Sequence, residues 1–216
     1  MSTLIERTKT FVEKTLQDNE GGHDHLHAFH VHRVAKAIAE REGGVNMEIV
    51  ECGALLHDIA DAKFHGGNEE VGPKLAYDFL KQEGAPEEIC EHITNIVRHI
   101  SFKGSLEGQK WMSPELAIVQ DADRLTGMGA IGIARTFNYG GSKGRKIYDP
   151  EIPPRPQQTK EEYTKSIAPT INHFYEKLLL LKDLMNTETG RHMAAVRHQR
   201  MEQFLENFYE EWNGLA

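Results

Sequence analysis

Apolar residues recur along this chain at intervals of three and four positions, and no convincing run of alternating apolar and polar residues interrupts them. Such intervals place apolar side chains on one face of an α-helix, whereas strands alternate. The pattern therefore predicts an all-α fold. The predicted helices of the first part of the chain cover about residues 4–16, 30–42, 46–58, 71–84, 86–100 and 114–125.

Residues that favour helix ends support several of these boundaries. Thr3 and Glu6 match a capping box before the first helix, Asn46 suits the N-cap of the third, and Pro86 stands where the fifth would begin. The third helix is apolar enough that we expect it to lie at the centre of the core.

The regular pattern weakens after residue 126. Glycines interrupt the apolar segment 127–137, and residues 139–145 and 149–158, rich in glycine and in proline, predict a long loop. Residues 159–212 predict two or three long amphipathic helices. No internal repeat and no clear linker divides the chain, which favours a single domain.

Aromatic residues gather near the C-terminus. We expect them to pack helices together rather than to line a ligand site. Any that stay exposed would favour a homodimer. These residues are Phe204, Phe208, Tyr209 and Trp212.

Composition argues against several classes of protein. The 216 residues include 33 acidic and 25 basic side chains, and the net charge of −8 argues against an extended nucleic acid as partner. Cys52 and Cys90 form no Cys-x-x-Cys pair, so neither a disulfide framework nor a thiolate zinc site is expected. No apolar run reaches the roughly 18 residues of a membrane span, and no secretory leader is present, so we expect a cytoplasmic protein outside the membrane.

The twelve histidines point to metal ligation or to proton transfer near neutral pH. His57 and Asp58 end the apolar third helix, where two polar side chains would be costly to bury unless a ligand binds them. His30 lies on the preceding predicted helix and Asp123 on a later one. Two imidazoles and two carboxylates from three helices could bind a divalent cation such as Mn²⁺, Fe²⁺, Co²⁺ or Zn²⁺ and leave positions open for water and substrate.

These four residues occur within ordered motifs, namely His30-x-x-Arg33-Val34, Leu55-Leu56-His57-Asp58-Ile59 and Asp121-Ala122-Asp123-Arg124-Leu125. The order His, His-Asp, Asp resembles that of the HD-domain metal-dependent phosphohydrolases. Segments 62–67, 100–104 and 129–137 extend the resemblance to the small stand-alone bacterial group typified by YpgQ and YedJ. The resemblance covers the chain from about residue 23 to the C-terminus.

The resemblance implies one all-helical domain over residues 1–216, with an HD core at about 23–130 and a helical extension at about 159–216. It also implies one divalent metal ion, with Mn²⁺ as the usual activator and Fe²⁺, Co²⁺, Ni²⁺, Mg²⁺ or Zn²⁺ as alternatives. The expected substrate is a small phosphorylated compound, above all a nucleoside triphosphate cleaved to release pyrophosphate. The alternatives are a phosphomonoesterase, a cyclic phosphodiesterase, and a non-catalytic regulator that binds metal or nucleotide.

Other polar residues are candidates for the remaining steps. Asp61 could orient the attacking water, and His92, which shares a helical face with His99, could protonate the leaving group. The structural alternatives are a solvated turn at Asp61 and partly exposed helix histidines. An anionic transition state needs fixed positive partners. The candidates for that role are Lys63, Lys103, Arg124, Lys143 and Arg145.

Two positions depart from the family's pattern. Many relatives carry Asp three residues before the first ligand histidine, where this chain has His27, and Asp after the Asp-Ala-Asp-Arg-Leu motif, where it has Thr126. Neither residue is an expected ligand. His27 could nevertheless change the metal preference or the pH profile.

Overall fold

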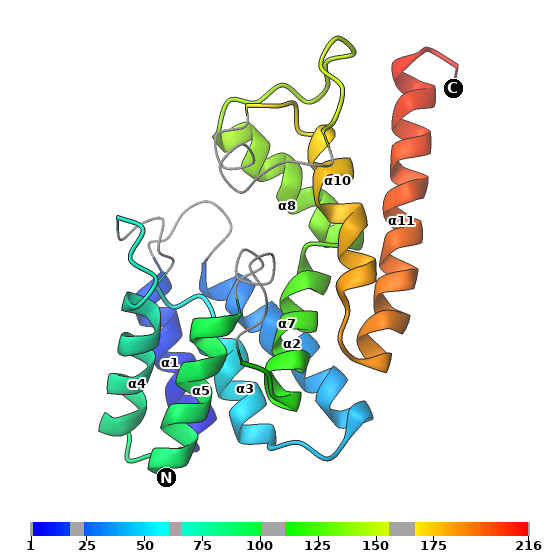
Figure 1. Ribbon diagram of the computed structural model, residues 1–216. Helices are drawn as coiled ribbons and strands as arrows, with labels where there is room; N and C mark the ends of the chain where they lie inside the picture. Colours follow the sequence, from blue (N-terminus) through cyan, green and yellow to red (C-terminus); the bar gives the residue numbers. More distant parts are fainter. Residues whose placement is uncertain (1, 18–23, 61–65, 101–110, 156–166, 216) are drawn as a thin grey trace. The chain divides into compact units, whose positions relative to one another are not determined.

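The computed structural model describes residues 2–17, 24–60, 66–100, 111–155 and 167–215, and the regular elements among them are all helical (Figure 1). The prediction of an all-α fold is confirmed. The chain divides into two compact units, unit 1 (Met1–Asp123) and unit 2 (Arg124–Ala216). The boundary falls within helix α7 (Pro114–Thr126).

Most of the helix ends predicted from the sequence fall in unit 1. Thr3 and Glu6 form the predicted capping box, and the side chain of Asn46 accepts the N–H bonds that begin the third helix. The second helix starts earlier than predicted because the Asp24 side chain accepts the N–H of His27. Within the described residues before α7, unit 1 contains the helices α1 (Leu4–Leu16), α2 (His25–Glu42), α3 (Met47–Leu56), α4 (Val71–Gln82) and α5 (Glu87–His99).

Helix α3 is the central helix of unit 1, as its apolar sequence predicts. It packs against α1, α2 and α5, and every residue from Ile49 to Leu56 is buried. Gly53 permits a close approach to α5, since a Cβ there would lie 3.1 Å from Ile96 Cδ1. Each fully buried Leu or Ile contributes about 1.5–3 kcal/mol, so α3 is held firmly. His57 follows directly at its C-terminal end.

Unit 2 departs further from the sequence predictions. The predicted loop at 139–145 is wrong for its first part, because α8 (Gly129–Ser142) continues through it. Gly140 serves close packing there, since a Cβ would lie 2.2 Å from Thr170 Oγ1. Within the described residues only one C-terminal helix is long, α11 (Glu188–Trp212), and it follows α10 (Asn172–Glu176) and a 3-10 helix, η2 (Leu178–Leu184).

Aromatic rings hold unit 2 together. Their centroids lie 5.6–6.1 Å apart in the cluster Phe137, Phe174 and Phe204. A second set surrounds Tyr148, whose ring makes edge contacts with Phe208, Tyr209 and Trp212. The predicted packing role of the α11 aromatics is confirmed by these contacts. None of the helices in the described part of the chain combines the length and the apolar character that a membrane crossing requires.

Candidate metal centre

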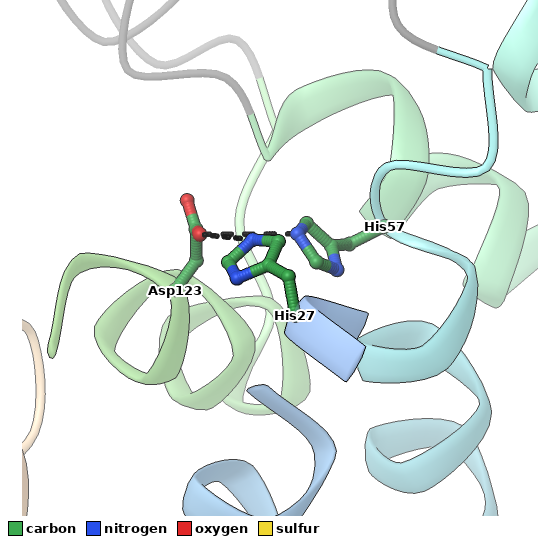
Figure 2. A group of neighbouring side chains, drawn as sticks. All are labelled: His27, His57 and Asp123. Atoms are coloured by element: carbon green, nitrogen blue, oxygen red, sulfur yellow. Dashed lines mark ion pairs between the residues drawn. The ribbon is translucent and has the colours of Figure 1, made fainter. Parts of the chain in front are cut away.

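Three side chains from separate elements of unit 1 converge on one point (Figure 2). His27 comes from the first turn of α2, His57 from the residue that ends α3, and Asp123 from near the end of α7. Asp123 Oδ1 lies 3.5 Å from His27 Nε2 and 3.8 Å from His57 Nε2. Ligand atoms bound to one cation at about 2.1 Å stand about 3–3.5 Å apart, so small adjustments would let all three share an ion.

The ring of His57 is oriented by the main chain. Its Nδ1 lies 2.8 Å from the carbonyl oxygen of Ala54, which can only accept a hydrogen bond, so Nδ1 carries the proton. In the neutral ring, Nε2 then presents a lone pair. That atom is buried and has no hydrogen-bond partner within the described residues, while it faces His27 and Asp123. A metal-binding histidine has this arrangement, with one nitrogen on the ion and the other donating to a fixed acceptor.

Burial gives the group a closed side and an open side. His27 and His57 are 8% and 5% exposed, and their rings meet edge to face with centroids 5.3 Å apart. The Asp123 side chain is 40% exposed. Water and a small substrate could therefore approach from the carboxylate side, while the imidazoles lie in the core.

A buried contact ties the helices that carry the two histidines. His32 Nε2 on α2 lies 2.7 Å from Glu51 Oε2 on α3, and both side chains are buried. Burial lowers the pKa of His32 from its usual value, and the hydrogen bond to Glu51 opposes that shift only in part. His32 thus serves the packing of α2 against α3, which sets the spacing between His27 and His57.

The structure brings together two of the four predicted metal ligands, His57 and Asp123. His30 and Asp58 are described but do not belong to the group of three, and His27 supplies the second imidazole. The sequence offers two overlapping registers one helical turn apart, His27-x-x-His30-Val31 and His30-x-x-Arg33-Val34. The arginine favoured the second register, whereas Asp24 as a helix cap three residues before His27 was the available signal for the first.

The other candidate residues lie in varied surroundings. His92 contacts Ser113 and Glu115 at the start of α7. Arg124 is buried, and its guanidinium donates to the carbonyl of Leu184 within unit 2. The cationic groups of Lys143 and Arg145 stand over the Tyr139 ring, 5.7 and 5.9 Å from its centroid. Asp61, Lys63 and Lys103 lie outside the described residues.

Comparison with protein families gives a match to the HD domain over residues 25–128. A protein of Bacillus subtilis (strain 168), the uncharacterized protein YpgQ, is 35% identical over 212 residues, covering 97% of this chain and 94% of its own length.

Solved structures are similar over nearly the whole chain. A Lactobacillus plantarum protein superimposes with a TM-score of 0.83 at 38% identity, covering 99% of this chain and 100% of that one. An HD-superfamily hydrolase from Bacillus thuringiensis gives 0.76 at 47% identity, with 97% and 96% covered. B. subtilis YpgQ in complex with ADP gives 0.76 at 30% identity, with 98% and 100% covered.

Proposed function

Because this chain belongs to the HD domain family, whose members bind divalent metals, we propose that it is a metal-dependent phosphohydrolase. Its ligands in this proposal are His27, His57 and Asp123. The proposed substrate is a nucleoside triphosphate, which water cleaves between the α- and β-phosphates to give a nucleoside monophosphate and pyrophosphate.

One observation carries the proposal, namely the fixed ring of His57. Leaving a buried polar atom without a hydrogen bond costs about 1–3 kcal/mol, and a ligand bound at that atom would offset the cost. Here the atom is Nε2 of a ring whose other nitrogen is engaged by Ala54, and another imidazole and a carboxylate lie beside it. A divalent cation is the ligand that this donor set suits.

The chemistry follows from the donor set. A divalent cation at this point supplies Lewis acidity, which polarises a phosphoryl oxygen and lowers the pKa of a coordinated water. The two buried imidazoles exclude bulk water from the inner side, and the exposed Asp123 carboxylate leaves the outer side accessible to a phosphate group. We propose Mn²⁺ as the activating ion, since mixed imidazole and carboxylate donors accept it and the resemblance points to it.

The proposed nucleotide rests on a relative. YpgQ has been solved in complex with ADP, and it covers 98% of this chain. A phosphomonoester or a cyclic phosphodiester is the alternative substrate class within the same family. A regulator that binds metal or nucleotide without turnover is the alternative outside enzymes.

A product assay tests the function. The protein is stripped with a chelator, reloaded with Mn²⁺ and incubated with a panel of nucleoside triphosphates, phosphomonoesters and cyclic dinucleotides. We expect pyrophosphate release from the triphosphates only, lost on chelation and restored by Mn²⁺. Undiminished turnover after chelation would refute the metal requirement, and nucleotide binding without any product would favour the regulator.

A matched pair of variants tests which histidine is the ligand. His27→Ala and His30→Ala remove imidazoles one turn apart on the same helix. We expect His27→Ala to lose Mn²⁺ binding and His30→Ala to retain it. The reverse result would restore His30 as the ligand, as the sequence motif suggested, and Asp58→Asn in the same assay tests the fourth predicted ligand.

A further inference from the structure

Helices α5 and α7 are joined by two side-chain contacts with equal spacing. At the first, Nε2 of His92 lies 2.9 Å from Ser113 Oγ and 3.3 Å from Glu115 Oε2. At the second, the Gln120 amide donates to the carbonyl of His99, 3.1 Å away. Residues 92 and 99 are seven apart, and so are 113 and 120. The two helices therefore run in the same direction over this stretch, and α7 is held at two points two turns apart.

The first contact is a hydrogen bond from the imidazole. The Glu115 carboxylate oxygen beside His92 Nε2 can only accept, which favours the proton on this nitrogen, and Nε2 then donates to Ser113 Oγ and makes an ion-pair contact with Glu115. The Ser113 hydroxyl in turn accepts the N–H of Leu116 and caps α7. The edge of the His92 ring also meets Trp111, with centroids 5.3 Å apart.

Glu115 also links α7 to α3, the helix that ends at His57. The second carboxylate oxygen of Glu115 accepts the N–H of Asn46, the N-cap of α3. Helices α3 and α7 thus start from one anchored point. His57 and Asp123 lie eleven and ten residues beyond Asn46 and Ser113, which is roughly 15 Å along each helix. Helices α3 and α7 thus place His57 and Asp123, two of the three proposed ligands, at similar distances from this anchored point.

We propose that His92 and Gln120 are positioning residues, which fix the register of α7 so that the Asp123 carboxylate reaches the cation held by His27 and His57. This inference rests on the metal site of the proposed function. A slip of one residue along α7 would move Asp123 by about 1.5 Å and turn it by about 100°, whereas metal–ligand distances tolerate only about 0.2 Å. His92 acts here through α7, three turns from Asp123, rather than as the acid that protonates a leaving group.

The test measures Mn²⁺ affinity of the apo-protein by titration, in parallel with melting temperature. His92→Phe keeps a ring against Trp111 but removes the donor, and Gln120→Met keeps the length but removes the amide. We expect each variant to bind Mn²⁺ about 10–100-fold more weakly, the range seen when groups that orient metal ligands are lost. His92→Gln retains an N–H that can donate to Ser113 Oγ, and we expect it to restore the affinity to within about threefold.

Arg7→Met supplies the matched control. It breaks the contact between Arg7 on α1 and Glu83 at the end of α4, which involves no residue of α7. We expect a lower melting temperature with unchanged Mn²⁺ affinity, which separates positioning from general stability.

Each outcome bears on a different proposal. If the wild type binds no divalent cation, the metal site and the positioning role both fail. If the wild type binds Mn²⁺ and the two variants bind it equally well, only the positioning role fails. If His92→Phe keeps its Mn²⁺ affinity but loses turnover, His92 is the general acid and the positioning role is overturned.

Discussion

Units 1 and 2 both bury polar side chains, but they use them differently. In unit 1, the buried Nε2 of His57 has no hydrogen-bond partner within the described residues and faces two other potential ligands. In unit 2, the guanidinium groups of Arg124 and Arg197 donate to the carbonyls of Leu184 and Leu125, near helix ends. The first arrangement leaves a cost that a cation would remove. The second satisfies carbonyls that the helices leave open.

The contrast shows that the position of a residue in a sequence motif is a weak guide to its role in the structure. Arg124 directly follows Asp123, yet its guanidinium is turned to the main chain of unit 2. Unit 2 also contains a buried nitrogen with no hydrogen-bond partner in the described part of the chain, Nδ1 of His198, but Nε2 of the same ring contacts Glu202 one turn along α11, 3.3 Å away. Among the described residues, only the group in unit 1 combines such an atom with converging ligands.

The largest expected effect tests unit 1. His57→Leu removes the oriented nitrogen while filling a similar volume. We expect Mn²⁺ affinity to fall by more than about 100-fold, because a ligand is lost rather than a group that orients one. The free energy of unfolding of the metal-free protein should change by less than about 1 kcal/mol, since the lost bond to Ala54 is offset by removal of a buried unsatisfied atom. Calorimetry with Mn²⁺ measures the affinity, and denaturant unfolding measures the stability of the metal-free protein. A large loss of that stability would mean that His57, like the arginines of unit 2, mainly stabilises the fold.

The next effect tests unit 2. Arg124→Met and Arg197→Met each remove a charged donor to a carbonyl, and we expect each to lower the free energy of unfolding by about 2–3 kcal/mol. Their effects on the KM of the substrate should be equally small. A KM raised more than about tenfold in Arg124→Met alone would show that Arg124 binds phosphate, as predicted from sequence.

A pH effect of smaller size belongs to unit 2. Burial, with Lys177 and Arg145 nearby, lowers the pKa of His173 to about 3. The unfolded chain takes up a proton near pH 6.5 that the folded chain refuses, so this contribution to stability is complete above pH 6.5 and declines as the pH falls toward 3. Between pH 7 and 5 we expect a loss of about 1–2 kcal/mol. His173→Gln should remove that part of the pH dependence, and an unchanged slope would contradict the assignment.

The smallest expected signal reports on unit 1 alone, because Cys52 and Cys90 both lie there. Burial raises the pKa of the Cys52 thiol to about 12, although its hydrogen bond with Thr8 acts in the opposite direction. Its thiolate is therefore scarce at pH 7, and we expect alkylation only when unit 1 opens. Mass spectrometry should show slower labelling of Cys52 when Mn²⁺ is present. A rate unaffected by Mn²⁺ would mean that the cation does not stabilise unit 1.

Local signals in the sequence predicted much of unit 1. The capping box at Thr3, the cap at Asn46 and the apolar run ending at His57 each depend on neighbouring residues, and the structure contains all three. The choice between His27 and His30 depends on which face of α2 meets α3 and α7. Residues distant in sequence decide that, and the local signal for His27 is the Asp24 cap of α2 three residues before it.

Unit 2 was harder to predict because tertiary packing overrides local preference there. Glycines disfavour a helix in isolation, yet α8 continues through Gly140, where Thr170 leaves no room for a side chain. Residues 159–212 predict two or three long helices, but residues 178–184 form a 3-10 segment that precedes the N-cap of α11, Thr187. Neither feature could be predicted from the residues of a single helix.

The hydrogen bond from His57 to the carbonyl of Ala54 links the final turn of α3 to the proposed metal site. The acceptor is main chain, so no side-chain substitution at Ala54 deletes it. Any fraying of that turn would release the ring, and any ion seated on the ring would resist the fraying. If the proposed site binds a cation, cation binding and the winding of this helical turn are coupled, so that changes elsewhere that loosen or tighten α3 alter the affinity for the cation.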